Sequence, residues 1–319
     1  MRQGGAAPSG KWMGQAVGGV AAPHPLILPD PVKRFADTAE RLESLAGGHP
    51  MEAWLRFMAR LAQAQGIAAA ALPRPTPVAS ALVERAVEAR LPPIAADDHR
   101  RDPAWQGALA VLLYELIDGP LSGNASPGAP LPDAARRIAV GLRQASRDDI
   151  ETLADAFLTG SVPTERAGEV FYVAAALQVY FTRLAGSLPA ETLRLLPGRG
   201  LCPCCGSTPV AGLVTASGRT PGTRYLTCSL CATTWNHVRA VCITCGESRA
   251  LSLMAIEGGG DVAKAETCDN CRTYSKTLYQ AKAMRTDPFA DDFATLALDV
   301  LLAEAGWVRH APNPLLMMQ

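Results

Sequence analysis

All nine cysteines of this 319-residue chain lie between Cys202 and Cys271, and this clustering constrains the fold more than any other feature of the sequence. Eight of them form Cys-x-x-Cys pairs, and the last two pairs follow the first two at a constant offset of 40 residues. The pairs are Cys202 with Cys205, Cys228 with Cys231, Cys242 with Cys245, and Cys268 with Cys271. Five other residues recur at the same offset: Gly206, Leu213, Gly218, Thr227 and Thr233 return as Gly246, Leu253, Gly258, Thr267 and Thr273. The region is therefore an internal duplication.

Each copy of the duplication has the spacing of a closed metal site, with 22 residues between its two pairs. A Cys-x-x-Cys turn directs two thiolates to one point, and a hairpin that joins two such turns brings four thiolates to the corners of a tetrahedron. A unit of about 40 residues buries too little surface to fold alone, whereas a structural ion held by four thiolates contributes on the order of 10–16 kcal/mol. The spacing predicts two metal ions per chain, one bound by Cys202, Cys205, Cys228 and Cys231 and the other by Cys242, Cys245, Cys268 and Cys271.

Other uses of the cysteines are less favoured. Nothing in the sequence marks secretion, so disulfides are not expected, and a dithiol enzyme does not need four pairs in register. Paired hairpin turns with this spacing favour a mononuclear ion over an iron–sulfur cluster. Four soft sulfur ligands admit both zinc and iron. The Cys-Pro-x-Cys-Gly pattern of residues 202–206 is rubredoxin-like, whereas residues 242–246 keep the glycine and lack the proline.

Three residues near the first pairs are predicted not to bind the metal ion directly. Cys204 lies between two ligands and is interpreted as an occupant of the variable position of the turn. His237 lies six residues beyond Cys231, and with four thiolates already present it is predicted to be a surface or hydrogen-bonding residue. Trp235 is predicted to cover the metal site.

The charge and hydropathy of the chain argue against two classes of partner. Lysine and arginine total 30 residues, as do aspartate and glutamate, and residues 202–271 contain five basic and five acidic residues. A ribbon built to bind nucleic acid usually has a basic excess, so no nucleic-acid partner is predicted. No run of 18 apolar residues is present, so membrane insertion is not predicted either.

The pattern along the chain predicts a multidomain α+β fold: an N-terminal all-α helical domain, two tandem rubredoxin-like or zinc-ribbon four-cysteine modules, and a C-terminal helix. The helix over 165–185 is apolar on most sides, as expected in the middle of a bundle. The predicted parts are a disordered or extended tail over 1–30, the all-α domain over 31–197, the first metal module over 198–240, the second over 241–284, and a C-terminal helix and tail over 285–319.

Details of the helix ends follow from capping residues. Asp102 with Pro103 and Ser146 with Asp149 are predicted to begin two helices of the N-terminal domain. After the metal modules, a short helix is predicted over 273–283 and a longer one from Asp287 to residue 305. Asp292 and Asp299 share a face of that helix and are interpreted as a solvated or partner-facing stripe.

No catalytic set is present in the sequence. The chain lacks the GxGxxG, Walker, GxSxG and HExxH patterns. The histidines outside the cysteine region, which are His24, His49, His99 and His310, lie in predicted loops or at segment ends. The chain is therefore predicted not to be an enzyme.

Longer motifs give the chain a family resemblance. The stretches CPCCGSTPV, RYLTCSLCATTW, RAVCITCGE, KAETCDNCRTYSK and ADDFATLALDVLLAEAGWVRHAPNP resemble the formate dehydrogenase accessory protein family, FdhE. The likeness is strongest from Arg199 to Pro314 and continues more weakly over most of the chain after residue 22.

The resemblance implies a cytoplasmic, non-catalytic maturation factor with two rubredoxin-like modules. Such a protein binds the catalytic subunit of a respiratory formate dehydrogenase that is exported by the twin-arginine route, and it is needed for the activity of that enzyme. The resemblance favours iron at the eight paired cysteines, with zinc as the alternative, and permits a homo-oligomer. Two other functions remain open: a rubredoxin-like electron carrier or redox regulator, and a nucleic-acid-binding zinc ribbon, which the charge balance disfavours.

Overall fold

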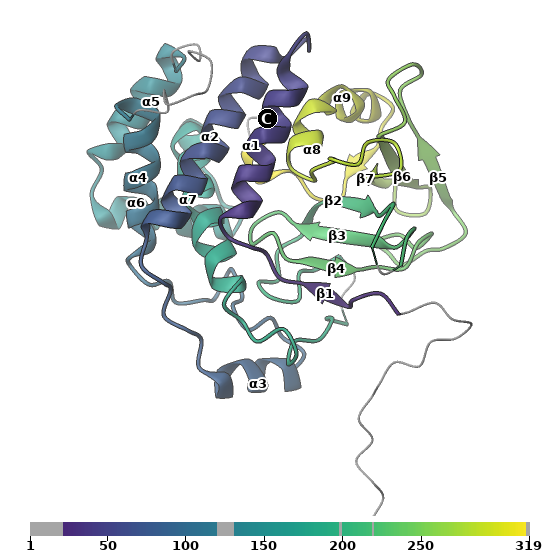
Figure 1. Ribbon diagram of the computed structural model, residues 1–319, viewed down its shortest axis with the longest axis horizontal. Coiled ribbons are helices and arrows are strands. Elements are labelled where there is room, and N and C mark those ends of the chain that lie inside the picture. The colour runs from purple at the N-terminus through teal and green to yellow at the C-terminus, as the bar shows by residue number, and fades with distance from the viewer. Residues whose placement is uncertain (1–21, 120–130, 198–199, 219, 317–319) are drawn as a thin grey trace, which may run out of the picture.

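The computed structural model describes residues 22–119, 131–197, 200–218 and 220–316 (Figure 1). Most helices gather on one side of the molecule and the strands on the other, where the two C-terminal helices lie beside the sheet (Figure 1). The chain thus combines α and β structure as predicted. Most of the predicted N-terminal tail, residues 1–21, lies outside the described residues. Among the helices of the described segments, none is both long enough and apolar enough to cross a lipid bilayer.

The helical side is built around α7 (Ala167–Ala185), whose residues are buried on nearly all faces as its sequence predicts. It packs against α2 (Glu52–Ala71), α4 (Trp105–Ile117), α5 (Asp133–Arg143) and α6 (Arg147–Leu158). The remaining helices of this side are α1 (Lys33–Ala46) and α3 (Ser80–Glu88), with a short 3-10 turn (Thr164–Arg166) before α7. A central helix without a polar face can only be stable when neighbours surround it, which is the arrangement found.

Of the two predicted helix starts, the one at Ser146 is found and the one at Asp102 is displaced. The Ser146 hydroxyl accepts a hydrogen bond from the Asp149 backbone N–H at 3.1 Å, so Ser146 caps α6. Asp102 accepts a hydrogen bond from the backbone N–H of Ala104 at 2.9 Å, but α4 begins only at Trp105 and has no side-chain cap. Ser146 therefore satisfies a backbone donor that a helix leaves free at its start, whereas Asp102 fixes the turn before α4.

The duplicated region forms one continuous sheet, which within the described residues has eight strands in the order β1-β4-β3-β2-β7-β6-β5, with β8 beside β7. The first copy supplies β2 (Pro209–Val214), β3 (Arg224–Cys228) and β4 (Thr234–Asn236). The second copy supplies β5 (Leu251–Met254), β6 (Ala263–Cys268) and β7 (Thr273–Tyr279). Each copy is an antiparallel meander, and the two copies join where β2 runs parallel to β7.

Two short strands attach distant parts of the chain to the sheet. β1 (Leu26–Ile27) pairs with β4, so the segment before the helices forms one edge. β8 (Val308–Arg309) runs parallel to the start of β7 and ties the C-terminal region to the second copy.

The prediction of a short helix over 273–283 was wrong, because most of this segment is β7. Its backbone pairs with β6 from Cys268↔Thr273 to Ala263↔Leu278. The sequence TYSKTLY has the alternating, aromatic and β-branched character that favours a strand. The repeat itself indicates the same result, since Thr273 corresponds to Thr233, which leads into strand β4.

The predicted single C-terminal helix is interrupted at Thr295, giving α8 (Ala290–Ala294) and α9 (Leu296–Glu304). The Lys276 ammonium group, which is fully buried, donates to the backbone oxygens of Asp292 at 2.9 Å and Thr295 at 3.2 Å. In an uninterrupted helix those carbonyls would accept hydrogen bonds from the backbone N–H groups four residues later. Because Lys276 on β7 occupies them instead, it stabilises the break.

The interpretation of Asp292 and Asp299 as a solvated stripe was also wrong. Asp292 is fully buried, and it forms ion pairs with Lys276 at 3.0 Å and with Arg309 at 2.6 Å. Asp299 pairs with Lys276 at 2.5 Å. These carboxylates therefore join α8, α9, β7 and β8 into one buried ionic cluster, because a buried charge must be paired.

Candidate metal centres

The first centre consists of Cys202, Cys205, Cys228 and Cys231, whose sulfur atoms lie within 4.8 Å of one another. The Sγ atoms of Cys202 and Cys231 are 3.5 Å apart, and those of Cys205 and Cys228 are 3.4 Å apart. A tetrahedral ion with metal–sulfur bonds of about 2.3 Å requires sulfur–sulfur separations of about 3.8 Å. All nine cysteines, which the structure describes, are free thiols. The donor set and its spacing therefore fit one ion.

The second centre consists of Cys242, Cys245, Cys268 and Cys271, which form an equally compact group. Its sulfur pairs, Cys242 with Cys271 and Cys245 with Cys268, are each 3.7 Å apart. Neither centre borrows a cysteine from the other copy. The structure thus brings the eight predicted cysteines together as the two predicted sets of four, each of which can hold a zinc or an iron ion.

The two centres have the same backbone construction. The first turn of each closes with an N–H donated to a cysteine carbonyl, Gly206 to Cys202 at 2.9 Å and Gly246 to Cys242 at 3.0 Å. Both glycines have φ near +78°, at +78° and +79°, a conformation that disfavours a side chain. The second turn of each contains a non-glycine residue with positive φ, Ala232 in one copy and Arg272 in the other. The duplication seen in the sequence is therefore a duplication of turn geometry.

The first centre lies inside the main core of the protein. Its four cysteines are at most 1% exposed and belong to the same buried cluster as the helical residues. The segment before α4 donates two backbone hydrogen bonds to the first turn, Ile94 to the Cys204 oxygen at 3.0 Å and Ala96 to the Cys205 oxygen at 2.9 Å. From the other side, the Gln178 amide of α7 donates to the Ser229 oxygen at 2.8 Å. This centre therefore fastens the sheet to the helices.

Burial and hydrogen bonding both act on the pKa values of the thiols in the first centre, and they act in opposite directions at Cys205. Burial raises the pKa of the Cys202, Cys228 and Cys231 thiols well above the usual value. Although burial acts in the same direction on Cys205, hydrogen bonds from the neighbouring thiols hold the pKa of Cys205 well below that value. Desolvation of the half-buried Arg34 guanidinium lowers its pKa to about 10, while the charges of Asp287 and Cys228 act in the opposite direction. A cation near a thiolate compensates part of its negative charge.

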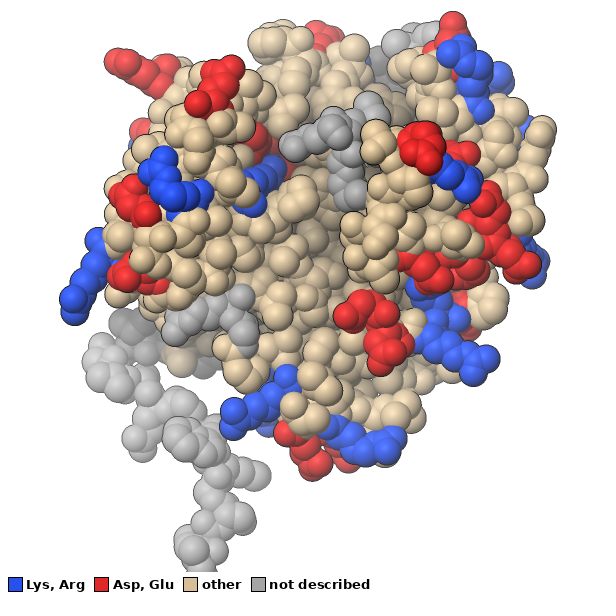
Figure 2. Space-filling view, turned by 180° about the vertical axis from the view of Figure 1, so that it is seen from behind, with Lys and Arg blue, Asp and Glu red and all other residues tan. Residues whose placement is uncertain are grey.

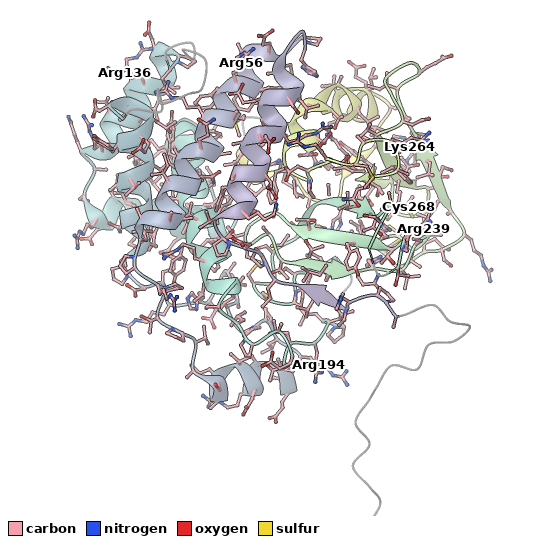
Figure 3. All side chains as sticks on the ribbon, in the orientation of Figure 1. Arg56, Arg136, Arg194, Arg239, Lys264 and Cys268 are labelled. Atoms are coloured by element: carbon pink, nitrogen blue, oxygen red, sulfur yellow. The ribbon has the colours of Figure 1, made fainter. Side chains whose placement is uncertain are left out.

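The second centre is open to solvent. Cys245 is exposed and Cys271 is half-buried, whereas Cys242 and Cys268 are buried. The Asn270 amide donates to the Cys245 sulfur at 3.5 Å, and this contact together with a backbone donor lowers the pKa of Cys245 to about 6. In Figure 3, Cys268 lies on the sheet side of the molecule with Arg239 and Lys264, whereas Arg136 lies on the helical side. The two centres thus share a geometry and differ in access.

Of the three residues predicted near the first centre, Cys204 and His237 lie as expected, and the covering role of Trp235 stays a prediction. Cys204 is fully buried and belongs to neither set of four; its backbone N–H donates to the Cys202 sulfur at 3.4 Å. His237 is not part of the first centre, and its Nδ1 lies 2.9 Å from the Val238 oxygen. Trp235 is buried in the same cluster as the first-centre cysteines.

One residue of the second centre was missed from the sequence. His310 was placed among the scattered histidines, yet its Nδ1 lies 2.8 Å from the hydroxyl of Thr244, which is in the first turn of that centre. The only sequence feature that points to this contact is the likeness of the closing motif, because 66 residues separate the two positions in the chain.

Comparison with known protein families gives three matches that follow one another along the chain. The model described as FdhE, N-terminal, matches residues 23–197, the model for the FdhE central domain matches residues 201–239, and the model for the FdhE C-terminal domain matches residues 240–316.

Individual relatives are similar over nearly the whole length. A protein FdhE homolog from Edwardsiella ictaluri is 37% identical over 293 residues, which cover 92% of this chain and 91% of the relative. A protein FdhE homolog from Pseudomonas aeruginosa is 37% identical over 287 residues, with 88% and 89% coverage. The crystal structure of the FdhE protein from Pseudomonas aeruginosa is similar with a TM-score of 0.79 and 36% identity, covering 92% of this chain and 99% of that one.

Proposed function

The chain belongs to the FdhE family, and from this premise we propose that it is a cytoplasmic accessory protein needed for formate dehydrogenase activity. Its partner is the catalytic subunit of a respiratory formate dehydrogenase, which it binds before that subunit is exported folded by the twin-arginine route. The protein acts by binding and not by catalysis, in keeping with a sequence that lacks the common catalytic motifs.

The two centres hold one metal ion each in this proposal, bound by the eight paired cysteines. A bound ion cross-links each hairpin, and an iron ion would also accept and return one electron. The chain's own residues give the centres different tasks. Buried in the main core, the first keeps the sheet attached to α7 through Gln178 and Ser229. The second lies at the solvent-exposed part of the sheet, where a partner can reach it.

The exposure of Cys245 is the main observation that supports a partner-binding role for the second centre. A centre that only stabilised the fold would be expected to be enclosed, as the first one is. Apolar side chains on and just after the edge strand β5 are exposed nearby, among them Leu253, Met254 and Ile256. Apolar side chains beside an accessible centre suit a protein partner.

The charge distribution supports a protein partner over a nucleic acid. Figure 2 shows acidic and basic side chains interspersed on one face of the molecule, with no gathering of lysine and arginine alone. Nucleic-acid binding requires a basic surface because it is dominated by phosphate contacts.

A pull-down with the tagged full-length chain tests the proposal. The formate dehydrogenase catalytic subunit should be recovered with the wild-type chain and with Cys204→Ala, in which both sets of four cysteines are intact. Recovery should fall with Cys245→Ser. A strain that lacks the chain should lose formate oxidation and regain it with the wild type. Undiminished formate oxidation in that strain, with no subunit recovered, would refute the proposal.

The exposure of Cys245 also favours a second candidate function, a rubredoxin-like electron carrier or redox regulator. Electron transfer needs an ion near the surface, and only the second centre has one exposed ligand. This candidate predicts a coloured, iron-loaded native protein that dithionite bleaches reversibly. A colourless protein loaded with zinc in its native host would exclude it.

A further inference from the structure

A chain of hydroxyl contacts connects a histidine to a sulfur of the second centre. The Nδ1 of His310 lies 2.8 Å from the Thr244 hydroxyl, which lies 2.9 Å from the Thr273 hydroxyl. The Thr273 hydroxyl in turn lies 3.0 Å from the Sγ of Cys271. All three distances are within hydrogen-bond range, so His310 touches no ligand and yet is linked to one through two side chains.

The fold holds His310 firmly in this place. Its backbone N–H donates to the Tyr274 oxygen at 2.8 Å, directly after the parallel pairing of β8 with β7. The preceding residue, Arg309, is fixed by ion pairs with Asp292 at 2.6 Å and Asp299 at 3.3 Å. On the far side of the ring lies Gly200, where a Cβ would come within 2.9 Å of Nε2. The half-buried ring therefore lies between the C-terminal cluster and the segment that leads into the first centre.

The direction of the hydrogen bonds follows from the sulfur. A metal-bound thiolate has no hydrogen and can only accept. The Thr273 hydroxyl must then donate to Cys271 and accept from Thr244, and the Thr244 hydroxyl must accept from His310. This order requires a hydrogen on Nδ1, since the opposite tautomer would turn both hydroxyls away from the sulfur. Burial lowers the pKa of His310, which favours a neutral ring with a single N–H.

The first centre has the contact between a threonine hydroxyl and a cysteine sulfur but not its extension to a histidine. There the Thr233 hydroxyl lies 3.2 Å from the Cys231 sulfur, as its counterpart does in the second centre. The residue that corresponds to Thr244 is Cys204, which has no hydroxyl to continue the chain. The extension to His310 is therefore specific to the exposed centre and is not a requirement of the fold of the module.

We propose that His310 is a positioning residue of the second centre, which acts through Thr244 and Thr273 to keep a hydrogen bond donated to the Cys271 sulfur. The inference rests on the proposed function in one respect, that the second centre holds an ion. Such outer contacts orient a ligand and disperse its charge, and their loss typically lowers metal affinity by about 10- to 100-fold. In an iron-loaded centre, a donated hydrogen bond also stabilises the reduced state and raises the reduction potential.

Zinc affinity of the full-length protein, measured by competition with a chromophoric chelator, tests the inference. The phase that belongs to the second centre is identified by its loss in Cys242→Ser. His310→Leu and Thr244→Val should each weaken this phase by about 10- to 100-fold and leave the first-centre phase unchanged. His310→Asn, whose amide can replace the Nδ1 donor, should retain most of the affinity.

The double variant separates the relay from a general loss of structure. If His310 acts through Thr244, then His310→Leu/Thr244→Val should bind as weakly as either single variant and no more weakly. The same variants should lower the reduction potential of the iron-loaded second centre. Additive losses, or wild-type affinity in His310→Leu, would overturn the inference. A wild-type chain that binds only one ion would overturn the proposed second metal site and the inference together. A wild-type chain that binds two ions, with a second-centre affinity that His310→Leu leaves unchanged, would overturn the inference alone.

Discussion

Replacing one cysteine in each centre should reveal two independent ions with unequal effects on stability. Cys202→Ser and Cys242→Ser should each remove one ion and leave the other, because no ligand is shared between the centres. A four-thiolate structural ion contributes on the order of 10–16 kcal/mol, and the total stability of a domain is only about 5–15 kcal/mol. The consequences therefore depend on how much of the protein each ion holds together.

The structure assigns most of that stability to the first ion. Cys202 and its three co-ligands are at most 1% exposed and belong to the main core, so their release disrupts the contact between the sheet and α7. We expect Cys202→Ser to lose more than about 5 kcal/mol, which lowers Tm by more than about 10 °C in a chain of this size or makes the protein insoluble. Cys242 closes a centre near the edge strand β5, so its replacement can be absorbed by local opening. The expected loss is below about 2 kcal/mol, which corresponds to a fall in Tm of at most about 4–8 °C.

Metal analysis and thermal unfolding followed by circular dichroism measure both effects on the same samples. Cys204→Ala is the matched control, since it removes a buried cysteine that belongs to neither centre. It should retain both ions. Loss of both ions from either serine variant, or an equal fall in Tm for the two, would refute the assignment of separate centres with different structural roles.

Three further predictions follow from the burial and pairing of particular residues. EDTA should extract metal from the wild type in two phases, because the second centre has an exposed ligand and should lose its ion faster. The faster phase should be absent from Cys242→Ser. A single phase in the wild type would contradict the difference in solvent access between the two centres. Lys276→Met should lower the free energy of unfolding in urea by about 3–5 kcal/mol, because it leaves the buried Asp292 with one cation fewer; a change below about 1 kcal/mol would argue against the ionic cluster. Gln178→Leu should cost about 1–3 kcal/mol by leaving the Ser229 oxygen unpaired, and Gln106→Leu, whose residue is less buried, should cost less.

The metal centres could be predicted from the sequence because their information is local. A Cys-x-x-Cys turn fixes two ligands within four residues, and the constant offset of the copies assigns each pair to its partner. Helix α7 was predictable for a similar reason, since its apolar residues on all faces require a central position. Ser146 likewise determines its cap through a contact only three residues away.

The errors arose where distant residues decide the local structure. The break at Thr295 depends on Lys276, and the burial of Asp292 depends on Lys276 and Arg309, which lie on strands that the helix pattern does not reveal. The strand that begins near Thr273 is the exception, because the repeat aligns Thr273 with Thr233 and so contains the local information for a strand. The contact between His310 and Thr244 could not be foreseen, because it requires the parallel pairing of β8 with β7.

X-ray absorption and metal analysis of the protein purified from its native host test the central claim most directly. The account predicts two ions per chain, each with four sulfur ligands at about 2.3 Å. Fewer than two ions, nitrogen or oxygen atoms among the ligands, or a metal–metal distance typical of a cluster would contradict it.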